Sequence, residues 1–304
     1  MPRIVVVGSY NRDLSFVMRR MPADGETVIG ADLVEGPGGK GSNQAIQAAR
    51  AGAYVSMLAA VGADGAGSEA VALWRRCGIA TRMVVRKDGV ATGSAAILVE
   101  ADGRNRIVVA SGANACLTAA DVRRAGGGIR ASALVVGQLE VPVAATQAAF
   151  AMARRAGAAT LLNAAPAISR IPASLLRLTD ILVVNEIEAR ALTGLTARAT
   201  PSTLARALGK FARLATVVTV GADGAWLAGA GRAPSRFPAP STKVVDTTGA
   251  GDAFVGAFAG RYALDGDVPA AMRWGIAAGS LACRKRGAAA SYAGVDAIAR
   301  VARA

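Results

Sequence analysis

The 304-residue chain contains no histidine. This absence excludes any Ser–His–Asp or Cys–His mechanism and any metal site with imidazole ligands, so a proton acceptor must be a carboxylate or another group. The three cysteines, Cys77, Cys116 and Cys283, lie far apart and form no CxxC pair. Their spacing argues against a disulfide framework or a structural zinc site and suits a reducing compartment.

Aromatic residues are scarce, at 4% of the chain, which leaves few side chains on which nucleic-acid bases could stack. The net charge of +14 comes mostly from arginines that are scattered along the sequence. We therefore expect no nucleic-acid partner, although a positive field would attract a polyanionic substrate. No apolar run approaches the roughly 18 residues of a membrane helix, and the apolar run at the N-terminus is too short for a secretory signal. We expect a cytoplasmic protein with no membrane partner.

Short apolar runs recur between Ala-rich stretches of helical length. Continuous apolar runs are typical of strands buried on both faces of a mainly parallel sheet. The runs are 3–9, 54–62, 133–140, 159–166, 180–189 and 215–227, and two of the helical stretches are 42–52 and 145–158. This alternation predicts an α/β fold, a doubly wound, mainly parallel sheet flanked by helices, with ligands at the carboxyl ends of the strands.

Two segments do not fit the alternation of strands and helices. Residues 12–36 and 91–110 read as hairpins, with turns at "ADGE" and "EADGRN". We expect them to form a small β-sheet that serves as a lid or a dimerisation surface. The remaining segments, 1–11, 37–90 and 111–304, would form the core domain.

The glycine-rich stretch "GPGGKG" at 36–41 matches G-x-G-x-x-G, but it does not follow the first core strand as a dinucleotide-binding motif would. A phosphate-binding Walker A loop is also excluded, because Gly41 stands where Ser or Thr is required. Two interpretations remain. The glycines form the entry to a helix, or they let a polar ligand approach the backbone, with Lys40 and Asn43 as donors.

Two later motifs each allow a structural and a functional interpretation. "TVGADGAW" at 219–226 follows a strand and fits a hairpin turn at Asp223–Gly224. "NEIEA" at 185–189 places Asn185 and Glu188 on one face of a first helical turn, where both could simply cap the helix.

The stretch "DTTGAGDAF" at 246–254 carries the strongest chemical signal. Gly249 and Gly251 permit backbone conformations that other residues avoid, so several N–H groups of a helix start can point at one anion. Asp252 beside that anion site would repel a bound phosphate. It makes sense as an acceptor of a hydroxyl proton while the N–H groups neutralise developing phosphoryl charge. A plain helix cap is the alternative.

Taken together, these motifs resemble the ribokinase/PfkB family of carbohydrate kinases over nearly the whole chain. "GGKGSNQAIQAARAGA" at 38–53 and "DTTGAGDAFVGAF" at 246–258 are similar to the two family signatures. Six further motifs occur in the expected order: "GSYNRD", "GQLEVP", "NAAP", "NEIEA", "TVGADGAW" and "RKRGAAAS".

The resemblance implies roles for individual residues. Asp252 would be the catalytic base, and Gly249, Ala250 and Gly251 would form an anion hole for the phosphoryl group. The sugar would be bound by Asn11, Asp13, Gly39, Lys40, Asn43, Glu140 and Asp252. The nucleotide site would include Asn185, Thr219, Gly221 and Gly224. Glu188 would hold Mg²⁺ through water, and a K⁺ site would involve Asp246, Thr248, Ala282, Gly287 and Ser291.

The resemblance also implies the reaction, which is transfer of the ATP γ-phosphoryl group to O5 of D-ribose, with Mg²⁺ required and K⁺ as activator. Asn11 favours a sugar with a 2-hydroxyl, because the similar deoxyribokinases tend to carry Met there. The alternatives are another sugar or a nucleoside as substrate, a non-catalytic sugar or nucleotide sensor and, more distantly, a dinucleotide-dependent oxidoreductase. Family resemblance further implies a homodimer formed through the lid.

Overall fold

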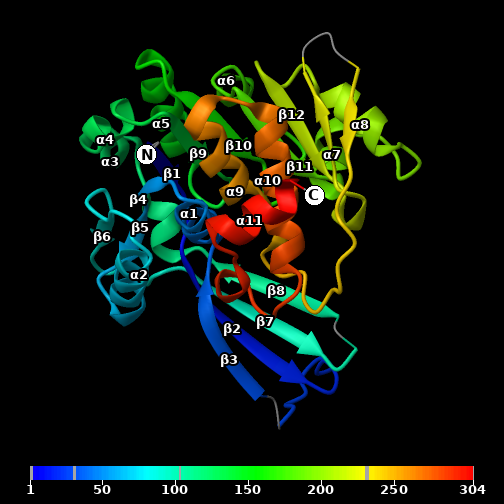
Figure 1. Ribbon diagram of the computed structural model, residues 1–304. Helices are drawn as coiled ribbons and strands as arrows, with labels where there is room; N and C mark the ends of the chain where they lie inside the picture. Colours follow the sequence, from blue (N-terminus) through cyan, green and yellow to red (C-terminus); the bar gives the residue numbers. More distant parts are fainter. Residues whose placement is uncertain (1–2, 30–31, 103, 230–232, 304) are drawn as a thin grey trace.

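The computed structural model describes residues 3–29, 32–102, 104–229 and 233–303. Its centre is an eight-stranded sheet in the order β14-β13-β12-β11-β10-β9-β1-β4 (Figure 1). The strands from β12 to β4 run parallel, and β13 and β14 add an antiparallel edge. Their bounds are β1 (Arg3–Val7), β4 (Tyr54–Leu58), β9 (Leu134–Gly137), β10 (Ala159–Asn163), β11 (Ile181–Asn185), β12 (Ala215–Thr219), β13 (Ala225–Ala228) and β14 (Ser235–Phe237).

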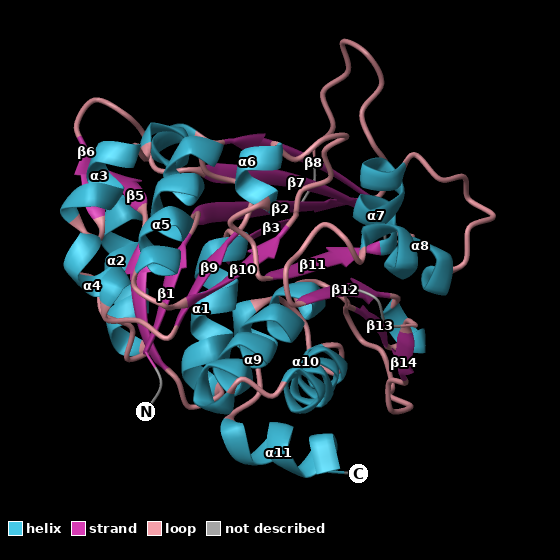
Figure 2. Ribbon diagram, turned by 90° about the horizontal axis from the view of Figure 1, so that it is seen from above, coloured by secondary structure: helices cyan, strands magenta, loops and turns pink. Residues whose placement is uncertain are grey.

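Helices cover both faces of this sheet, which confirms the predicted fold class (Figure 2). They are α1 (Lys40–Arg50), α2 (Gly65–Arg76), α3 (Ala119–Arg124), α4 (Gly126–Arg130), α5 (Val143–Arg155), α6 (Ala173–Leu176), α7 (Glu186–Thr193), α8 (Pro201–Leu208), α9 (Ala250–Asp265), α10 (Val268–Ala282) and α11 (Val295–Arg303). Short 3₁₀ turns occur at Gly112–Cys116, Gly221–Asp223 and Ala289–Ser291.

Successive side chains of β1 belong to the apolar clusters on opposite faces of the sheet. Val6 belongs to the buried apolar cluster that includes Ile46 of α1 and Phe258 of α9, whereas its neighbour Val5 belongs to the cluster that includes Phe150 of α5. Successive side chains of a strand point to opposite faces, so a strand covered on both sides must be apolar at every position.

One predicted strand is two strands in the structure. The apolar run at 54–62 divides into β4 and β5 (Ala60–Gly62), and β5 leaves the main sheet to pair in parallel with β6 (Val85–Lys87). The run at 215–227 contains a hairpin, since β12 and β13 pair antiparallel around the turn at Gly221–Asp223. The turn predicted from "TVGADGAW" is thereby confirmed.

A second sheet projects from the core with strand order β3-β2-β7-β8 (Figure 1). It consists of β2 (Asn11–Met18), β3 (Asp32–Gly38), β7 (Ser94–Glu100) and β8 (Asn105–Ala110). Within it, β2 pairs antiparallel with β3 and β7 with β8, while β2 and β7 run parallel. Its first strand begins one residue before the expected start at residue 12, and β3 extends two residues beyond the expected limit at residue 36.

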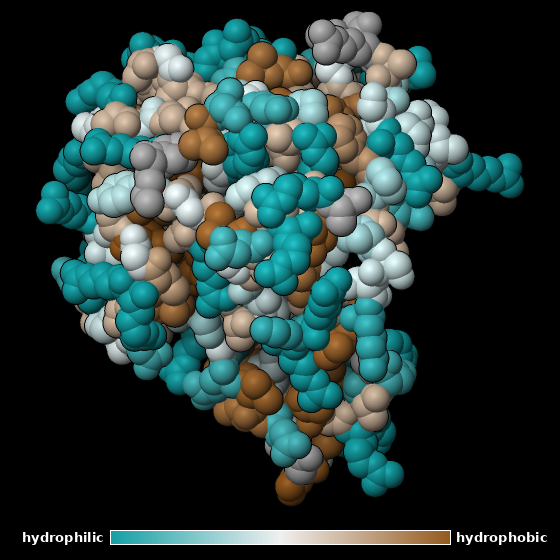
Figure 3. Space-filling model, viewed as in Figure 1, coloured by the Kyte–Doolittle hydropathy of each residue, from teal (hydrophilic) through white to brown (hydrophobic). Residues whose placement is uncertain are grey.

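The projecting sheet exposes apolar side chains, as the brown residues at the bottom of Figure 3 show. The exposed large apolar residues of these strands are Val17, Leu33, Val34, Ile107, Val108 and Val109. Because successive side chains of a strand point to opposite faces, these residues are divided between the two faces of the sheet.

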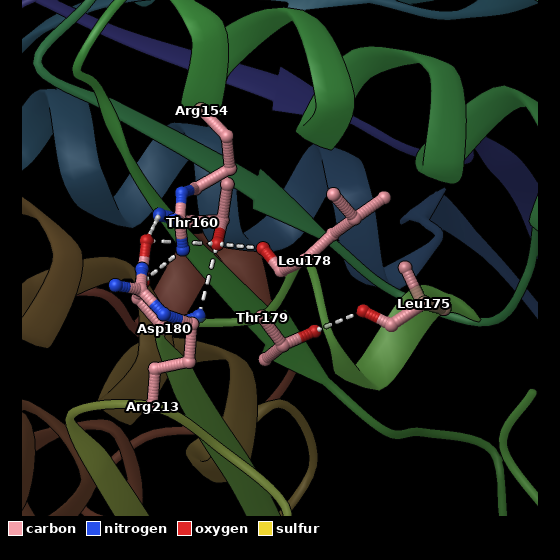
Figure 4. A network of polar contacts seen from close by, with 7 residues as sticks. All are labelled: Arg154, Thr160, Leu175, Leu178, Thr179, Asp180 and Arg213. Carbon is pink, nitrogen blue, oxygen red and sulfur yellow. Dashed lines mark hydrogen bonds and ion pairs between the residues drawn. The ribbon is translucent and has the colours of Figure 1, made fainter. Parts of the chain in front are cut away.

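A buried acidic side chain joins three elements at the amino ends of the parallel strands (Figure 4). Asp180 precedes β11 and forms ion pairs with Arg154 of α5 at 2.8 Å and with Arg213 at 2.6 Å. Its other oxygen accepts the backbone N–H of Thr160, at the start of β10, over 3.0 Å. This cluster lies at the opposite end of the strands from the site described next.

Candidate active site

Two adjacent cavities lie at the carboxyl ends of the parallel strands, where ligands bind in folds of this class. The smaller has a volume of about 220 Å³ and the larger about 600 Å³, and Thr219 and Gly251 line both. The smaller cavity is lined by Lys40, Asn163, Ala165, Val183, Val184, Asn185, Glu188, Thr219, Gly249, Gly251, Asp252 and Val255. Residues from β10, β11, α1, α7 and α9 therefore converge on one space.

The glycines of "GPGGKG" bring the start of α1 against the end of β1. Gly39 has φ 86°, and an added Cβ there would lie 2.8 Å from the backbone nitrogen of Asn11. An added Cβ on Gly41 would lie 2.5 Å from the nitrogen of Ser9. The first backbone N–H of the helix, that of Lys40, donates to Glu140 Oε2 at 2.9 Å. The helix-entry interpretation is confirmed, because α1 begins at Lys40, and Lys40 also lines the smaller cavity. That a polar ligand binds here stays a prediction.

The predicted sugar-binding residues lie around the base of β2. Asn11 is buried and accepts a hydrogen bond from Asn114 at 2.9 Å. Asp13 faces Gly38 so closely that any larger residue at 38 would overlap its carboxylate. Glu140 accepts a hydrogen bond from the Ser9 hydroxyl in addition to the Lys40 N–H.

Asp252 is only 8% exposed and lies in the first turn of α9. Both of its carboxylate oxygens accept hydrogen bonds from amide side chains of α1: Oδ2 from Asn43 at 3.0 Å and Oδ1 from Gln44 at 2.9 Å. Such bonds satisfy the polar atoms of a buried carboxylate and fix its orientation. The arrangement leaves a fixed carboxylate at the wall of the smaller cavity.

Charges in this region perturb one another. Burial, then Glu140 and Asp252, raises the pKa of Asp13 to about 6. Burial alone would lower the pKa of Lys40, but Asp252, Glu140, Glu188 and Asp13 outweigh it and raise that pKa above its ordinary value. Lys40 therefore stays protonated at physiological pH and lies among four carboxylates.

The pair in "NEIEA" forms a reciprocal helix cap. The backbone N–H of Glu188 donates to Asn185 Oδ1 at 2.8 Å, and that of Asn185 donates to Glu188 Oε2 at 2.8 Å. The capping interpretation is therefore confirmed, yet both side chains also line the smaller cavity. Burial raises the pKa of Glu188, partly offset by the Asn185 N–H and Lys40. Carboxylate and amide oxygens of this kind fit a hard cation such as Mg²⁺ held through water.

The start of α9 borders both cavities, and the N–H of Ala250 there donates to the carbonyl oxygen of Thr247 at 3.2 Å. Gly249 has φ 73°, a conformation that favours glycine, and an added Cβ would lie 2.6 Å from the Cβ of Ala288. The helix begins at Ala250, so its first N–H groups have no partner within the helix. Gly249 and Gly251 line the smaller cavity, and Ala250 and Gly251 line the larger one.

The larger cavity is mostly apolar. Gly221 and Gly224 line it, beside Thr219, from the turn between β12 and β13. Phe254 and Ile276 add side chains from α9 and α10.

The residues predicted to hold K⁺ are only partly in mutual contact. Asp246 Oδ1 accepts the backbone N–H and hydroxyl of Thr248 at 2.9 and 2.7 Å, and Oδ2 accepts the N–H of Gly287 at 2.8 Å. Ser291 instead donates to the carbonyl oxygen of Ala288, and the carbonyl oxygen of Ala282 accepts the N–H of Lys285. Within the described residues, no group of three Asp, Glu or Cys side chains is arranged to hold a metal ion.

Sequence reasoning missed several polar residues of the site. Gln44, Gln138 and Asn163 form hydrogen bonds behind Asp252, and the Tyr292 hydroxyl donates to the carbonyl oxygen of Gly249 at 3.1 Å. Gln44 lies four residues after Lys40 on α1, and residues at this spacing share one face of a helix. That spacing was the one signal in the sequence for the orientation of Gln44. No signal linked Tyr292 to Gly249.

Comparisons with known proteins agree with this geometry. Residues 1–293 match the model of the pfkB family of carbohydrate kinases. A mouse ribokinase is 40% identical over 84% of this chain and 80% of its own, and a deoxyribokinase of Salmonella typhi is 34% identical over 96% of both. The structure of Arabidopsis thaliana ribokinase with ribose and ATP superposes with a TM-score of 0.90, at 29% identity, over 100% of this chain and 99% of its own.

No helix among the described residues is both long and apolar enough to span a membrane. With both signatures at one site, and relatives matched along most of their lengths, the chain belongs to the pfkB family of carbohydrate kinases, phosphotransferases that act on an alcohol group.

Proposed function

We propose that this enzyme is an ATP-dependent ribokinase, which transfers the γ-phosphoryl group of ATP to O5 of D-ribose. The observation that carries the proposal is the position of Asp252, a buried carboxylate at the start of α9 that is fixed by two amides and lines the smaller cavity, beside the nucleotide-sized one. The mouse and Arabidopsis relatives, named as ribokinases, support ribose as the sugar.

In this proposal the sugar lies between the base of β2 and the start of α1. Asn11, Asp13, Gly39, Lys40, Asn43 and Glu140 hydrogen-bond its hydroxyls. Asp252 accepts the O5 proton as O5 bonds to the γ-phosphorus and the bond to the bridging oxygen of ADP breaks. The N–H groups of Gly249, Ala250 and Gly251 neutralise charge on the transferring group, which is what a loose phosphoryl transition state requires.

The nucleotide would occupy the larger cavity, with its base beside Gly221, Gly224 and Ile276 and its phosphates directed past Thr219 and Asn185 towards α9. Glu188 is the residue suited to hold Mg²⁺ through water, and the ion would supply neutralisation of the phosphate charge. Closure of the projecting sheet would exclude water that competes for the phosphoryl group.

A K⁺ site is proposed beside the anion hole, at Asp246, Thr248, Ala282, Gly287 and Ser291. Asp246 retains acceptor capacity beyond the three hydrogen bonds described, because a carboxylate has about four lone-pair sites. A rise in kcat on adding KCl, but not on adding choline chloride at equal ionic strength, would support the site. Equal rates would contradict it.

We further propose that the projecting sheet, 12–36 with 91–110, is a lid on the core formed by 1–11, 37–90 and 111–304, and that its exposed apolar residues pair two copies into a homodimer. Arginine in place of Val108, an exposed residue of the edge strand β8, would then shift the mass measured by light scattering from dimer to monomer. A wild-type monomer at micromolar concentration would contradict the pairing.

The activity test compares the wild type with Asp252→Asn. Asparagine preserves the shape but accepts no proton, so kcat should fall by about three or more orders of magnitude while calorimetry still detects ribose binding. Near-normal turnover would overturn the role of the base. Ribose binding without any phosphoryl transfer by the wild type would instead indicate a non-catalytic sensor.

The deoxyribokinase among the relatives makes 2-deoxyribose the second candidate substrate. Asn11, held by Asn114, is suited to bond a 2-hydroxyl, and a site built for a hydroxyl strongly rejects a substrate that lacks it. Ribose should therefore exceed 2-deoxyribose in kcat/KM. The same panel should include fructose, 2-keto-3-deoxygluconate, adenosine and pseudouridine, and a higher kcat/KM for any of them would replace ribose.

A further inference from the structure

Behind Asp252 lies a chain of three buried amide side chains that the reaction scheme above does not use. Gln44 Nε2 donates to Asp252 Oδ1 at 2.9 Å and also to Asn163 Oδ1 at 2.9 Å. Gln138 Nε2 donates to Gln44 Oε1 at 2.7 Å. Gln44 and Gln138 are fully enclosed, so water does not replace these bonds.

The hydrogen-bond partners define which way each amide faces. Asn163 Nδ2 donates to the carbonyl oxygen of Val183 at 3.1 Å, which leaves Asn163 Oδ1 directed at Gln44. The amino group of Gln44 therefore points at two acceptors, Asn163 and Asp252, and each receives one of its two hydrogens. Its carbonyl oxygen faces the Gln138 donor, so Gln44 is held at both ends.

The backbones of α1 and α9 approach closely at this point. An added Cβ on Gly256, one helical turn after Asp252, would lie 2.5 Å from the carbonyl oxygen of Gln44. Only a glycine lets the helices pack so that Asn43 and Gln44 reach the two oxygens of Asp252.

We infer that Gln44 is a positioning residue for phosphoryl transfer, one that fixes the rotation of the Asp252 carboxylate so that an oxygen faces the attacking hydroxyl. The inference rests on the proposed role of Asp252 as base. Asn43 also holds this carboxylate, but Asn43 is proposed to bind the sugar, whereas Gln44 acts only through Asp252. Small errors in the position of a reacting group reduce rates by about 100-fold, so a residue that fixes this carboxylate controls kcat.

The chain offers a matched control on the same helix. Gln47 is also a fully buried glutamine of α1, and its amide donates to the carbonyl oxygen of Ala293 at 3.0 Å. Replacing either glutamine with methionine removes a buried amide of the same size. Only Gln44→Met removes a hydrogen bond to Asp252.

The experiment measures kcat, KM for ribose and ATP, ribose binding by calorimetry, and Tm for both variants. Gln44→Met should lower kcat by about 10- to 100-fold, with far smaller changes in ribose affinity. Gln47→Met should lose comparable Tm but keep kcat. Equal kcat values for the two variants would overturn the inference.

A double-mutant cycle separates positioning from a general structural effect. In the Asp252→Asn background, Gln44→Met should cause little further loss of product formation, because the carboxylate it orients is gone. If the fold-reductions in kcat of the two single variants multiply in the double variant, the inference is overturned, while Asp252 remains the base. Near-normal turnover of Asp252→Asn alone would instead overturn the proposed function.

If Gln44→Met does not fold, Gln138→Met provides the second measurement. It removes only the donor that orients Gln44, and it should lower kcat several-fold at unchanged ribose affinity. An unchanged kcat in that variant would overturn the inference.

Discussion

Gly256 of α9 lies against the backbone of Gln44 of α1, and an added Cβ would stand 2.5 Å from the Gln44 carbonyl oxygen. This close approach is what joins the two signature segments into one site, since Asp252 and its amide donors lie on these two helices. A methyl group at 256 must push α1 and α9 apart.

We expect Gly256→Ala to destabilise the fold by about 1–3 kcal/mol and to lower kcat, because the same displacement lengthens the hydrogen bonds to Asp252. Thermal unfolding and steady-state kinetics measure both effects. Gly260→Ala is the matched control: its added Cβ would meet the Cβ of Ala51 at 3.1 Å, so a smaller shift relieves it. Wild-type Tm and kcat for Gly256→Ala would contradict the argument.

The Tyr292 hydroxyl supports the turn at Gly249, to whose carbonyl oxygen it donates at 3.1 Å. Burial, then Asp252, raises the pKa of Tyr292 well above its ordinary value, so the hydroxyl remains a donor at physiological pH. Tyr292→Phe should lose about 1 kcal/mol of stability and lower kcat several-fold, because the N–H groups beside Gly249 become less well placed.

The control for Tyr292 is Tyr262→Phe. Tyr262 is another buried tyrosine, but it lies near the far end of α9. Its loss should leave kcat unchanged. A Tyr292→Phe enzyme with full kcat would show that the turn at Gly249 holds without the hydroxyl.

The sequence predicted the parts of the site that local chemistry encodes. Asp252 and its flanking glycines lie within one short motif, and the start of α1 follows from "GGKG" and the Ala-rich run after it. The order of apolar runs predicted the parallel sheet, because burial on both faces demands continuous apolar strands.

What the sequence did not predict depends on the packing of distant segments. Nothing around Gln44 indicates that its amide meets Asp252, which lies 208 residues further along the chain. Likewise, Gly287 supplies an N–H to Asp246 only because the loop after α10 folds back on the loop before α9. The division of 54–62 into β4 and β5 was also missed, since both parts are equally apolar.

Asp180 provides a stability test away from the chemistry. Asp180→Ala leaves the buried N–H of Thr160 without its acceptor and removes two ion pairs with partly exposed arginines, so it should cost about 1–3 kcal/mol. Because the cluster lies at the amino ends of the strands, kcat at 25 °C should not change. Arg213→Ala should cost much less, since that side chain is half exposed. A large drop in kcat with an unchanged free energy of unfolding would contradict both expectations.

As pH rises, the ionisation of Asp13 should lower the stability of the fold and strengthen the binding of ribose. Its pKa in the folded protein is raised by burial, then by Glu140 and Asp252, from 3.8 to about 6. The folded state therefore binds the extra proton between these values. The contribution of Asp13 to the free energy of unfolding is therefore complete below pH about 3.8, and it is lost as pH rises through about 6.

Ribose binding should follow the opposite trend, because the ionised Asp13 is the better acceptor for sugar hydroxyls and forms as pH rises through 6. Asp13→Asn should bind ribose weakly at every pH and yet be more stable than the wild type at pH 8, by up to about 3 kcal/mol, with the difference shrinking towards pH 4. Thermal unfolding and calorimetry across pH 4–8 test both trends. The control is Asp32→Asn, at an exposed position of the neighbouring strand β3, which should change neither. If Asp13→Asn is instead less stable than the wild type at pH 8, the carboxylate is stabilised in its ionised form and the argument from burial fails.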